Sequence, residues 1–306
     1  MSDREIMVLG FQASGKTTFA AALWHLVDSR EISNTALAKG KHNGDFRYLE
    51  KIAKAWAAGW AVGRTLSEEW LPVEINLRRL EPATDVRLSF VDIAGETVER
   101  IFATREIDNR VEPLIRRASG ILLFVSTLRP QDDDSIVDLF LPFPDEAPPE
   151  GADEAINAEN NATGEAAVPI ETVAFEVGMT PLQVQLTDLL DSFCDAPLGM
   201  RPSRVAVIIS AWDKAFGTAM PQDWLQDHMP LLNQFLTAHA DSFETRFYGV
   251  SAQGGHVPMK EKPDEPSDRA QLLKERVASK RIKVVGHGAG QHDLTHPIAW
   301  LSGFES

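Results

Sequence analysis

The octapeptide GFQASGKT at residues 10–17 constrains this chain more than any other feature, and it directly follows the apolar run Ile6–Leu9. It matches GxxxxGK[ST] at every fixed position, between a strand-like and a helix-like segment, which is the context that this pattern requires. Gly10 and Gly15 allow the backbone to bend so that its amides converge on phosphate oxygens. A helix starting near Lys16 adds free N–H groups and a positive dipole end. The octapeptide therefore predicts a buried parallel strand, a phosphate-binding loop and a helix.

This loop is expected to hold a nucleoside triphosphate together with Mg²⁺. The ammonium of Lys16 would neutralise the β- and γ-phosphates, and the hydroxyl of Thr17 would ligate the metal ion. The residues expected to bind the nucleotide in this part of the chain are Gly10, Gln12, Ala13, Ser14, Gly15, Lys16, Thr17 and Thr18.

Strand-like and helix-like segments alternate along the rest of the chain, and most of the strand-like ones are apolar throughout. This pattern predicts an α/β fold with a doubly wound, mostly parallel sheet and helices on both faces. The segments 71–80 and 86–92 are joined too tightly for a parallel crossover, so they should form a hairpin with one antiparallel strand. Further strands are expected at 121–127, 205–210, 246–252 and 281–285, and helices at 45–59, 98–117, 181–193, 224–238 and 269–279.

The net charge of −15 is local to one segment of the chain. Residues 131–200 hold 16 acidic residues and no Lys or Arg, whereas the other 236 residues carry 29 acidic and 30 basic ones. We therefore expect a single domain over 1–306 with a partly disordered acidic insertion at 131–180, which is a solvated loop or a segment that docks a partner. Residues 257–306 are expected to form a C-terminal extension that packs on the domain.

The same composition excludes several classes of function. The balanced charge outside the insertion predicts no nucleic-acid-binding surface. No run of about 18 apolar residues is present, so no membrane insertion is expected. One cysteine, Cys194, rules out an internal disulfide framework, and no secretion signal is recognised at the start, so a cytoplasmic location is expected.

The tetrapeptide DIAG supplies a second set of candidate residues, 76 positions after Lys16. Asp92 follows the hairpin strand and is well placed to hold Mg²⁺ opposite the phosphate loop. The amide of Gly95 can reach the γ-phosphate, so the presence of that phosphate would move the following segment.

Two short motifs at the ends of later strands have the chemistry to read a purine base. Asp213, in the tetrapeptide SAWD, can accept two hydrogen bonds from the N1–H and the exocyclic amine of guanine, a donor pair that adenine lacks. The backbone amide of Ala252, between Ser251 and Gln253, can donate to the guanine O6. Both motifs would lie at the carboxyl edge of the sheet, where ligands bind in such folds.

The ordered set GFQASGKT, DIAG, SAWD and SAQ resembles the Ras-like, TRAFAC-class P-loop GTPases, over about residues 5–130 and 180–256. The sequences of the segments GKTTFAAALWHL and SAWD are similar to those of bacterial "double-GTPase" domains of predicted conflict and defence operons. The resemblance implies a six-stranded sheet with one antiparallel strand and a site that binds GTP or GDP with Mg²⁺. It assigns the mobile metal-binding threonine to Thr65, with Thr35 as the competitor.

This sequence departs from the family pattern at two places. Ser210 and Ala211 stand where the guanine motif usually has Asn and Lys, so guanine selectivity could be reduced. Glu96 stands where a glutamine usually orients water, which favours slow hydrolysis without a partner. Arg64, next to Thr65, is either an internal arginine finger or a surface arginine.

The sequence thus predicts a GTPase that acts as a nucleotide-controlled switch for an unidentified protein effector or a second GTPase. Its expected catalytic residues are Lys16, Arg64, Thr65 and Glu96, and its expected metal ligands are Thr17, Thr65 and Asp92. The alternatives are a P-loop ATPase or kinase, which would prefer adenine, and a nucleotide-bound scaffold that does not hydrolyse.

Overall fold

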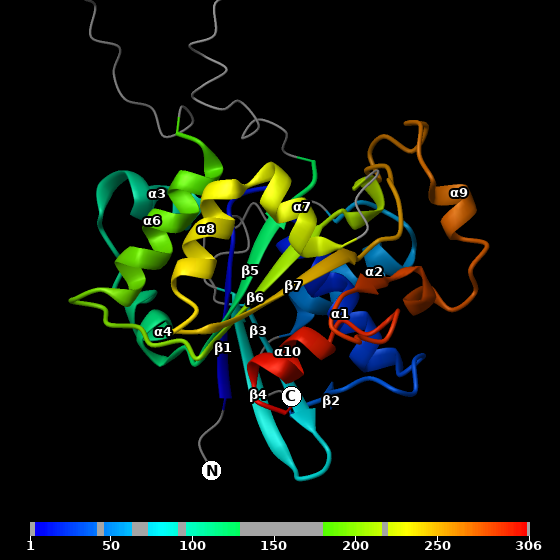
Figure 1. Cartoon of the computed structure of the whole chain (residues 1–306). Coiled ribbons are helices and arrows are strands. Elements are labelled where there is room, and N and C mark those ends of the chain that lie inside the picture. Colours follow the sequence, from blue (N-terminus) through cyan, green and yellow to red (C-terminus); the bar gives the residue numbers. More distant parts are fainter. Residues whose placement is uncertain are drawn as a thin grey trace, which may run out of the picture.

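The computed structural model describes residues 4–41, 46–62, 73–90, 96–128, 180–215 and 220–304, with the backbone alone at 96–97. Its centre is an eight-stranded sheet in the order β2-β3-β4-β1-β5-β6-β7-β8, with helices on both sides (Figure 1). The strands are β1 (Arg4–Leu9), β2 (Ala38–Lys39), β3 (Val73–Arg79), β4 (Thr84–Phe90), β5 (Gly120–Ser126), β6 (Arg204–Ser210), β7 (Glu244–Ser251) and β8 (Lys283–Val285).

Pairing within the sheet confirms the predicted fold class. Strands β4, β1, β5, β6 and β7 are parallel neighbours, and β3 forms the expected antiparallel hairpin with β4. The sheet has two more strands than the six that the resemblance implies, and of these two only β2 was not expected from the sequence. The short β2 pairs with β3, and β8 pairs antiparallel with β7. The prediction of one antiparallel strand is therefore short by one, because the chain turns back after β7 and adds β8 to the free edge.

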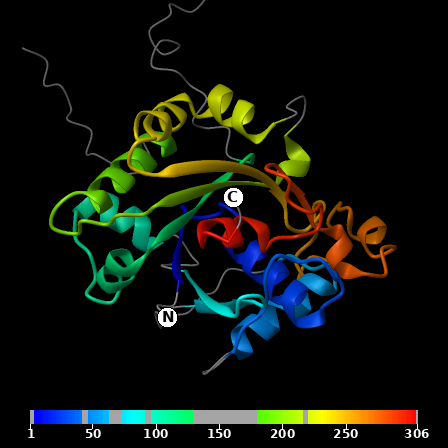
Figure 2. The same cartoon turned by 60° about the horizontal axis from the view of Figure 1, so that its bottom comes forward.

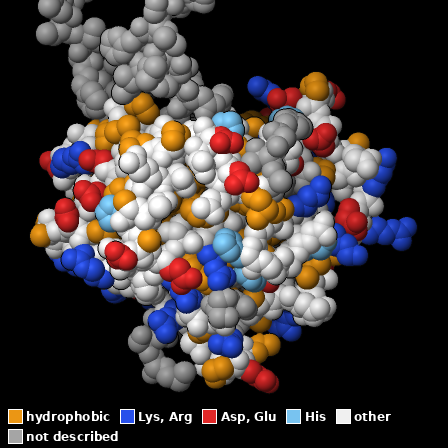
Figure 3. All heavy atoms as spheres, in the orientation of Figure 1, with side chains coloured by type: hydrophobic (Ala, Val, Ile, Leu, Met, Phe, Trp, Pro, Cys, Tyr) orange, Lys and Arg blue, Asp and Glu red, His pale blue; other side chains and the backbone are white. Residues whose placement is uncertain are grey.

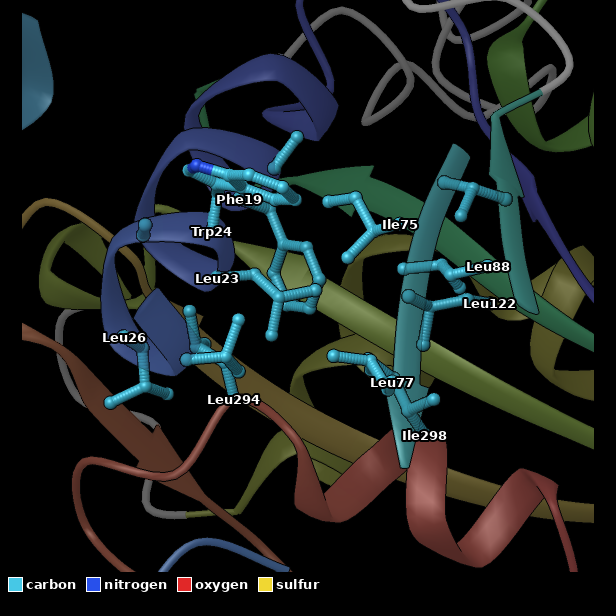
Figure 4. Close-up of a cluster of buried hydrophobic side chains, with 14 of the residues drawn as sticks. Phe19, Leu23, Trp24, Leu26, Ile75, Leu77, Leu88, Leu122, Leu294 and Ile298 are labelled. Atoms are coloured by element: carbon cyan, nitrogen blue, oxygen red, sulfur yellow. The ribbon is translucent and has the colours of Figure 1, made fainter. Parts of the chain in front are cut away.

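Side chains on the central strands alternate between two buried clusters, as expected for a sheet covered on both faces. On one face, Ile6 and Ile208 pack with α1 (Lys16–Ser29), α2 (Arg47–Ala57) and α10 (His296–Leu301). Figure 4 shows side chains of α1 directed at the strands from this side. On the other face, Met7 and Ile209 pack with α3 (Glu96–Thr104), α4 (Glu112–Arg117), α6 (Leu182–Cys194), α7 (Pro221–His228) and α8 (Pro230–Ala238). Figure 2 shows the resulting three layers.

Three predicted helices differ from those observed. The helix expected at 98–117 is two helices, because Arg105 adopts a left-handed φ of 60° after α3 and Pro113 lies in the first turn of α4. The helix expected at 224–238 is broken because Pro230 starts a new one, α8. The helix expected at 269–279 shortens to α9 (Arg269–Leu272), followed by the 3₁₀ turn η5 (Ala278–Arg281).

Candidate functional site

The loop between β1 and α1 curls around the ammonium group of Lys16. Its Nζ donates to the carbonyls of Gly10 and Phe11 at 2.5 and 2.7 Å and lies 3.4 Å from the Ser14 hydroxyl. Lys16 is only 3% exposed, and Gly15 caps α1 without any side-chain hydrogen bond to the helix N-terminus. The loop therefore gathers a cation and a helix N-terminus in one place, the two features that attract a phosphate.

Both glycines of the loop are required for space as well as for backbone freedom. A Cβ on Gly10 would lie 2.8 Å from Cβ of Phe124 on β5. A Cβ on Gly15, whose φ is 92°, would lie 2.8 Å from the side chain of Ser210 on β6. The loop thus packs directly on the ends of β5 and β6. Ser210, which stands where the guanine motif usually has Asn, lies in this tight contact.

Beyond β6, the turn η4 (Trp212–Lys214) presents the carboxylate of Asp213. Ala211 enters the turn with a left-handed φ of 53°, and its carbonyl accepts a 2.8 Å hydrogen bond from the hydroxyl of Thr127 at the end of β5. Ser251, the last residue of β7, donates its hydroxyl to Oδ1 of Asp213 at 2.5 Å. The carboxylate is thereby oriented by the neighbouring strand before any ligand arrives.

A cavity of about 690 Å³ extends from the phosphate loop to the turn η4 and to the residues that follow β7. Its lining includes Gly15 from the loop, Thr18 from the first turn of α1 and Asp213 from η4. Ala252 and Gln253 after β7 line it as well. The structure therefore brings Ala13, Gly15 and Thr18 of the predicted phosphate-binding residues together with the predicted base-reading residues, whereas Lys16 and Thr17 are not among the residues that line this cavity. Its volume lies in the range of small-molecule sites.

Several residues that line this cavity carry no signal in the sequence. Lys214 follows Asp213 in η4, and Val62 belongs to the segment after α2. Val257 and Asp268 come from the segment after β7, which folds back because Oδ2 of Asp268 accepts the His256 N–H at 2.9 Å. The glycines and prolines within 254–266 indicate a loop, but they do not predict that this loop lies against the site.

Four predicted residues, Arg64, Thr65, Asp92 and Gly95, lie outside the described residues, and Glu96 begins α3 without a described side chain. Their roles stay predictions. The described part of β4 ends at Phe90, which is in register with Val8 on β1.

On the face shown in Figure 3, basic and acidic side chains are interspersed and neither sign dominates a large area. Among the helices that the structure describes, none has both the length and the apolar character needed to cross a bilayer.

Comparison with known families identifies the family of this chain. The family model described as "Double-GTPase 1" matches residues 7–301, which includes the second half of β1, the phosphate loop, the strands β2 to β8 and the whole of α10. No curated protein matches the chain.

Proposed function

Because the chain belongs to the Double-GTPase 1 family, we propose that it binds GTP in the cavity described above and hydrolyses it with Mg²⁺ as a nucleotide-controlled switch. The observation that carries this proposal is the continuity of one cavity from Gly15 and Thr18 to Asp213 and Ala252. Phosphates at the loop and a base at the two turns would then belong to a single nucleotide.

The chemistry of the far end favours guanine. The carboxylate of Asp213, with Oδ1 already held by Ser251, accepts hydrogen bonds only from bases that carry donors at N1 and at the exocyclic C2 amine. Adenine presents an acceptor at N1, so it would leave the carboxylate unpaired and repelled. Lys214 also lines the cavity and brings a long cationic side chain to the site.

The donor set fits Mg²⁺ as far as it is described. Thr17 lies in the first turn of α1 with its side chain half-buried, and a hydroxyl oxygen is a hard ligand that suits this ion. Asp92 and Thr65 are proposed as the other ligands. When bound, the ion would neutralise charge that develops on the transferred phosphate.

For hydrolysis, we assign charge neutralisation to Lys16, water positioning to Glu96 and a contact with the transition-state phosphate to Arg64. The carboxylate of Glu96 would be repelled by the γ-phosphate, so turnover without a partner should be slow. If the purified protein hydrolysed many GTP molecules per minute alone, this assignment of Glu96 would be wrong. Unchanged hydrolysis and unchanged GTP binding in Arg64→Ala would remove Arg64 from the mechanism.

We further propose that the partner is a protein effector or a second GTPase, in a bacterial conflict or defence system. The γ-phosphate would order the segments at Thr65 and at Gly95–Arg105, and a partner would recognise these ordered segments. The family description supports the pairing of two GTPases. Adjacency of the gene to a second GTPase gene would support it independently.

A phosphate-release assay, combined with calorimetric titration of GTP, GDP and ATP, tests the proposal. We expect binding of GTP and GDP, little binding of ATP, and slow release of phosphate from GTP. A preference for ATP would favour the ATPase or kinase alternative instead. Tight GTP binding with no phosphate release, alone or with a partner GTPase, would favour the scaffold.

A further inference from the structure

The turn that is proposed to read guanine O6 is held by a tryptophan from a distant part of the chain. The indole Nε1 of Trp56, in the last turn of α2, donates to the carbonyl of Ala252 at 3.0 Å. The two residues are 196 positions apart in the sequence. Trp56 is fully buried and Ala252 is half-buried, so this hydrogen bond is partly withdrawn from water.

This contact holds the peptide that follows Ala252, which lies beyond the end of β7. The Ala252 N–H belongs to the peptide that follows Ser251, the last residue of β7, so the sheet holds that peptide from one side. The Ala252 carbonyl belongs to the next peptide, and Trp56 holds it from the other side. With both neighbouring peptides anchored, rotation about Ala252 is restricted and its N–H keeps one direction.

Trp56 itself is fixed by the C-terminal part of the chain. The guanidinium of Arg281, from η5, lies 4.7 Å from the centre of the indole ring. Its Nη2 donates to the carbonyl of Ala57 at 2.8 Å, at the end of α2 where helix carbonyls lack partners within the helix. Arg281 is 4% exposed, so a buried cation clamps the indole and the helix end together.

We propose that Trp56 is a positioning residue for base recognition, which aims the Ala252 N–H at the guanine O6 by holding the Ala252 carbonyl. The proposal rests on the proposed function, because it requires guanine to lie against Ala252. It makes α2 and η5 part of the specificity apparatus, although neither contains a recognised nucleotide motif.

The decisive variant is Trp56→Phe, which keeps an aromatic ring against Arg281 but removes the indole N–H. The probe is a pair of nucleotides, GDP and 6-thio-GDP. Sulfur is a weaker acceptor than O6, while the donors that face Asp213 are retained in both. In the native protein, GDP should bind several-fold more tightly than 6-thio-GDP, the effect of one hydrogen bond. In Trp56→Phe, the affinity for GDP should fall about fivefold and that for 6-thio-GDP less than twofold.

The matched control is Trp60→Phe, because Trp60 lies four residues further on and its ring stacks on Arg269, with 3.9 Å between the guanidinium and the ring centre. We expect this variant to keep the native ratio of the two affinities. An equal loss of both nucleotides in Trp56→Phe, or no loss of GDP, would overturn the proposal, since a merely structural tryptophan would not select between O6 and sulfur.

If Trp56→Phe fails to fold by circular dichroism, Arg281→Lys takes its place, because it keeps the charge but loses the fork that holds Ala57. The same selective loss of GDP is expected, and a parallel loss of both nucleotides again contradicts the proposal. Failure of the proposed function looks different. In that case the native protein itself would bind ADP as well as GDP, whereas failure of this inference alone would leave native guanine preference intact.

Discussion

Gly249→Ala, a change of one methyl group inside β7, should disable base recognition. Gly249 lies beneath the indole of Trp212, and a Cβ built there would be 2.3 Å from Cδ2 of that ring. Carbon atoms in contact prefer separations of about 3.5–4.0 Å, so the ring would have to retreat by more than about 1 Å. Asp213 follows Trp212 within the three-residue turn η4, so its carboxylate would move with the ring.

The magnitude follows from two separate effects. Overpacking of this kind costs about 1–3 kcal/mol of folding stability, which should appear as a fall of several degrees in Tm. Misplacement of Asp213 removes at least one hydrogen bond to a charged group, worth about 1.5–3 kcal/mol. GDP affinity should therefore fall about ten- to hundredfold, while the weaker binding of ADP, which Asp213 does not support, should change little.

Calorimetric titration of GDP and ADP into Gly249→Ala is the assay, with Gly290→Ala as the control. A Cβ on Gly290 meets its nearest neighbour, Cβ of Asp293, at an ordinary 3.5 Å, so that variant should bind like the native protein. In a Trp212→Ala background the added cost of Gly249→Ala should shrink, because the clashing ring is gone. Native GDP affinity in Gly249→Ala would refute the reasoning.

Three further predictions address the loop, the base and the C-terminal contacts. Lys16→Ala should weaken binding of GTP with Mg²⁺ at least about a hundredfold in the same titration, because several charge-assisted hydrogen bonds are lost. Asp213→Asn should shift the preference from GDP to XDP, because an amide donates where the xanthine O2 accepts; competition between the two nucleotides measures this. Burial raises the pKa of Glu31, but hydrogen bonds from Ser279 and the charge of His25 outweigh it and hold that pKa below its ordinary value of 4.5. The stability that this contributes is complete above pH 4.5 and is lost as the pH falls through the lowered pKa, so the Tm difference between Glu31→Gln and the native protein should vanish in acid. A difference that persists unchanged at pH 3 would contradict it.

The parts of the fold that the sequence predicts well are those that local patterns determine. Apolar runs such as Ile6–Leu9 predict buried strands because both faces of the sheet are covered. The loop at 10–17 is specified by glycines that the backbone needs. Helix boundaries are harder to predict. The apolar spacing continues across Arg105, and only the observed backbone shows that α3 ends before it. The spacing also continues across Pro230, where the proline itself was a signal that the helix cannot continue.

The site itself could be predicted only where a motif lies at the end of a strand. Asp213 and Ala252 follow apolar strands, and parallel strands bring their carboxyl ends to one edge. The walls of the cavity depend instead on contacts between distant segments. The Ala61 N–H donates to the carbonyl of Pro258 at 2.9 Å, and Trp56 reaches Ala252. The residue pattern within one segment does not predict such pairings, because each contact depends on a residue from a distant segment.

A crystal structure with a non-hydrolysable GTP analogue and Mg²⁺ tests the central claim most directly. We expect the β- and γ-phosphates within hydrogen-bond distance of Lys16 and the guanine N1 and exocyclic amine against the carboxylate of Asp213, in one continuous cavity. An analogue whose phosphates lie away from Lys16, or whose base leaves Asp213 paired with Ser251 alone, would contradict this account.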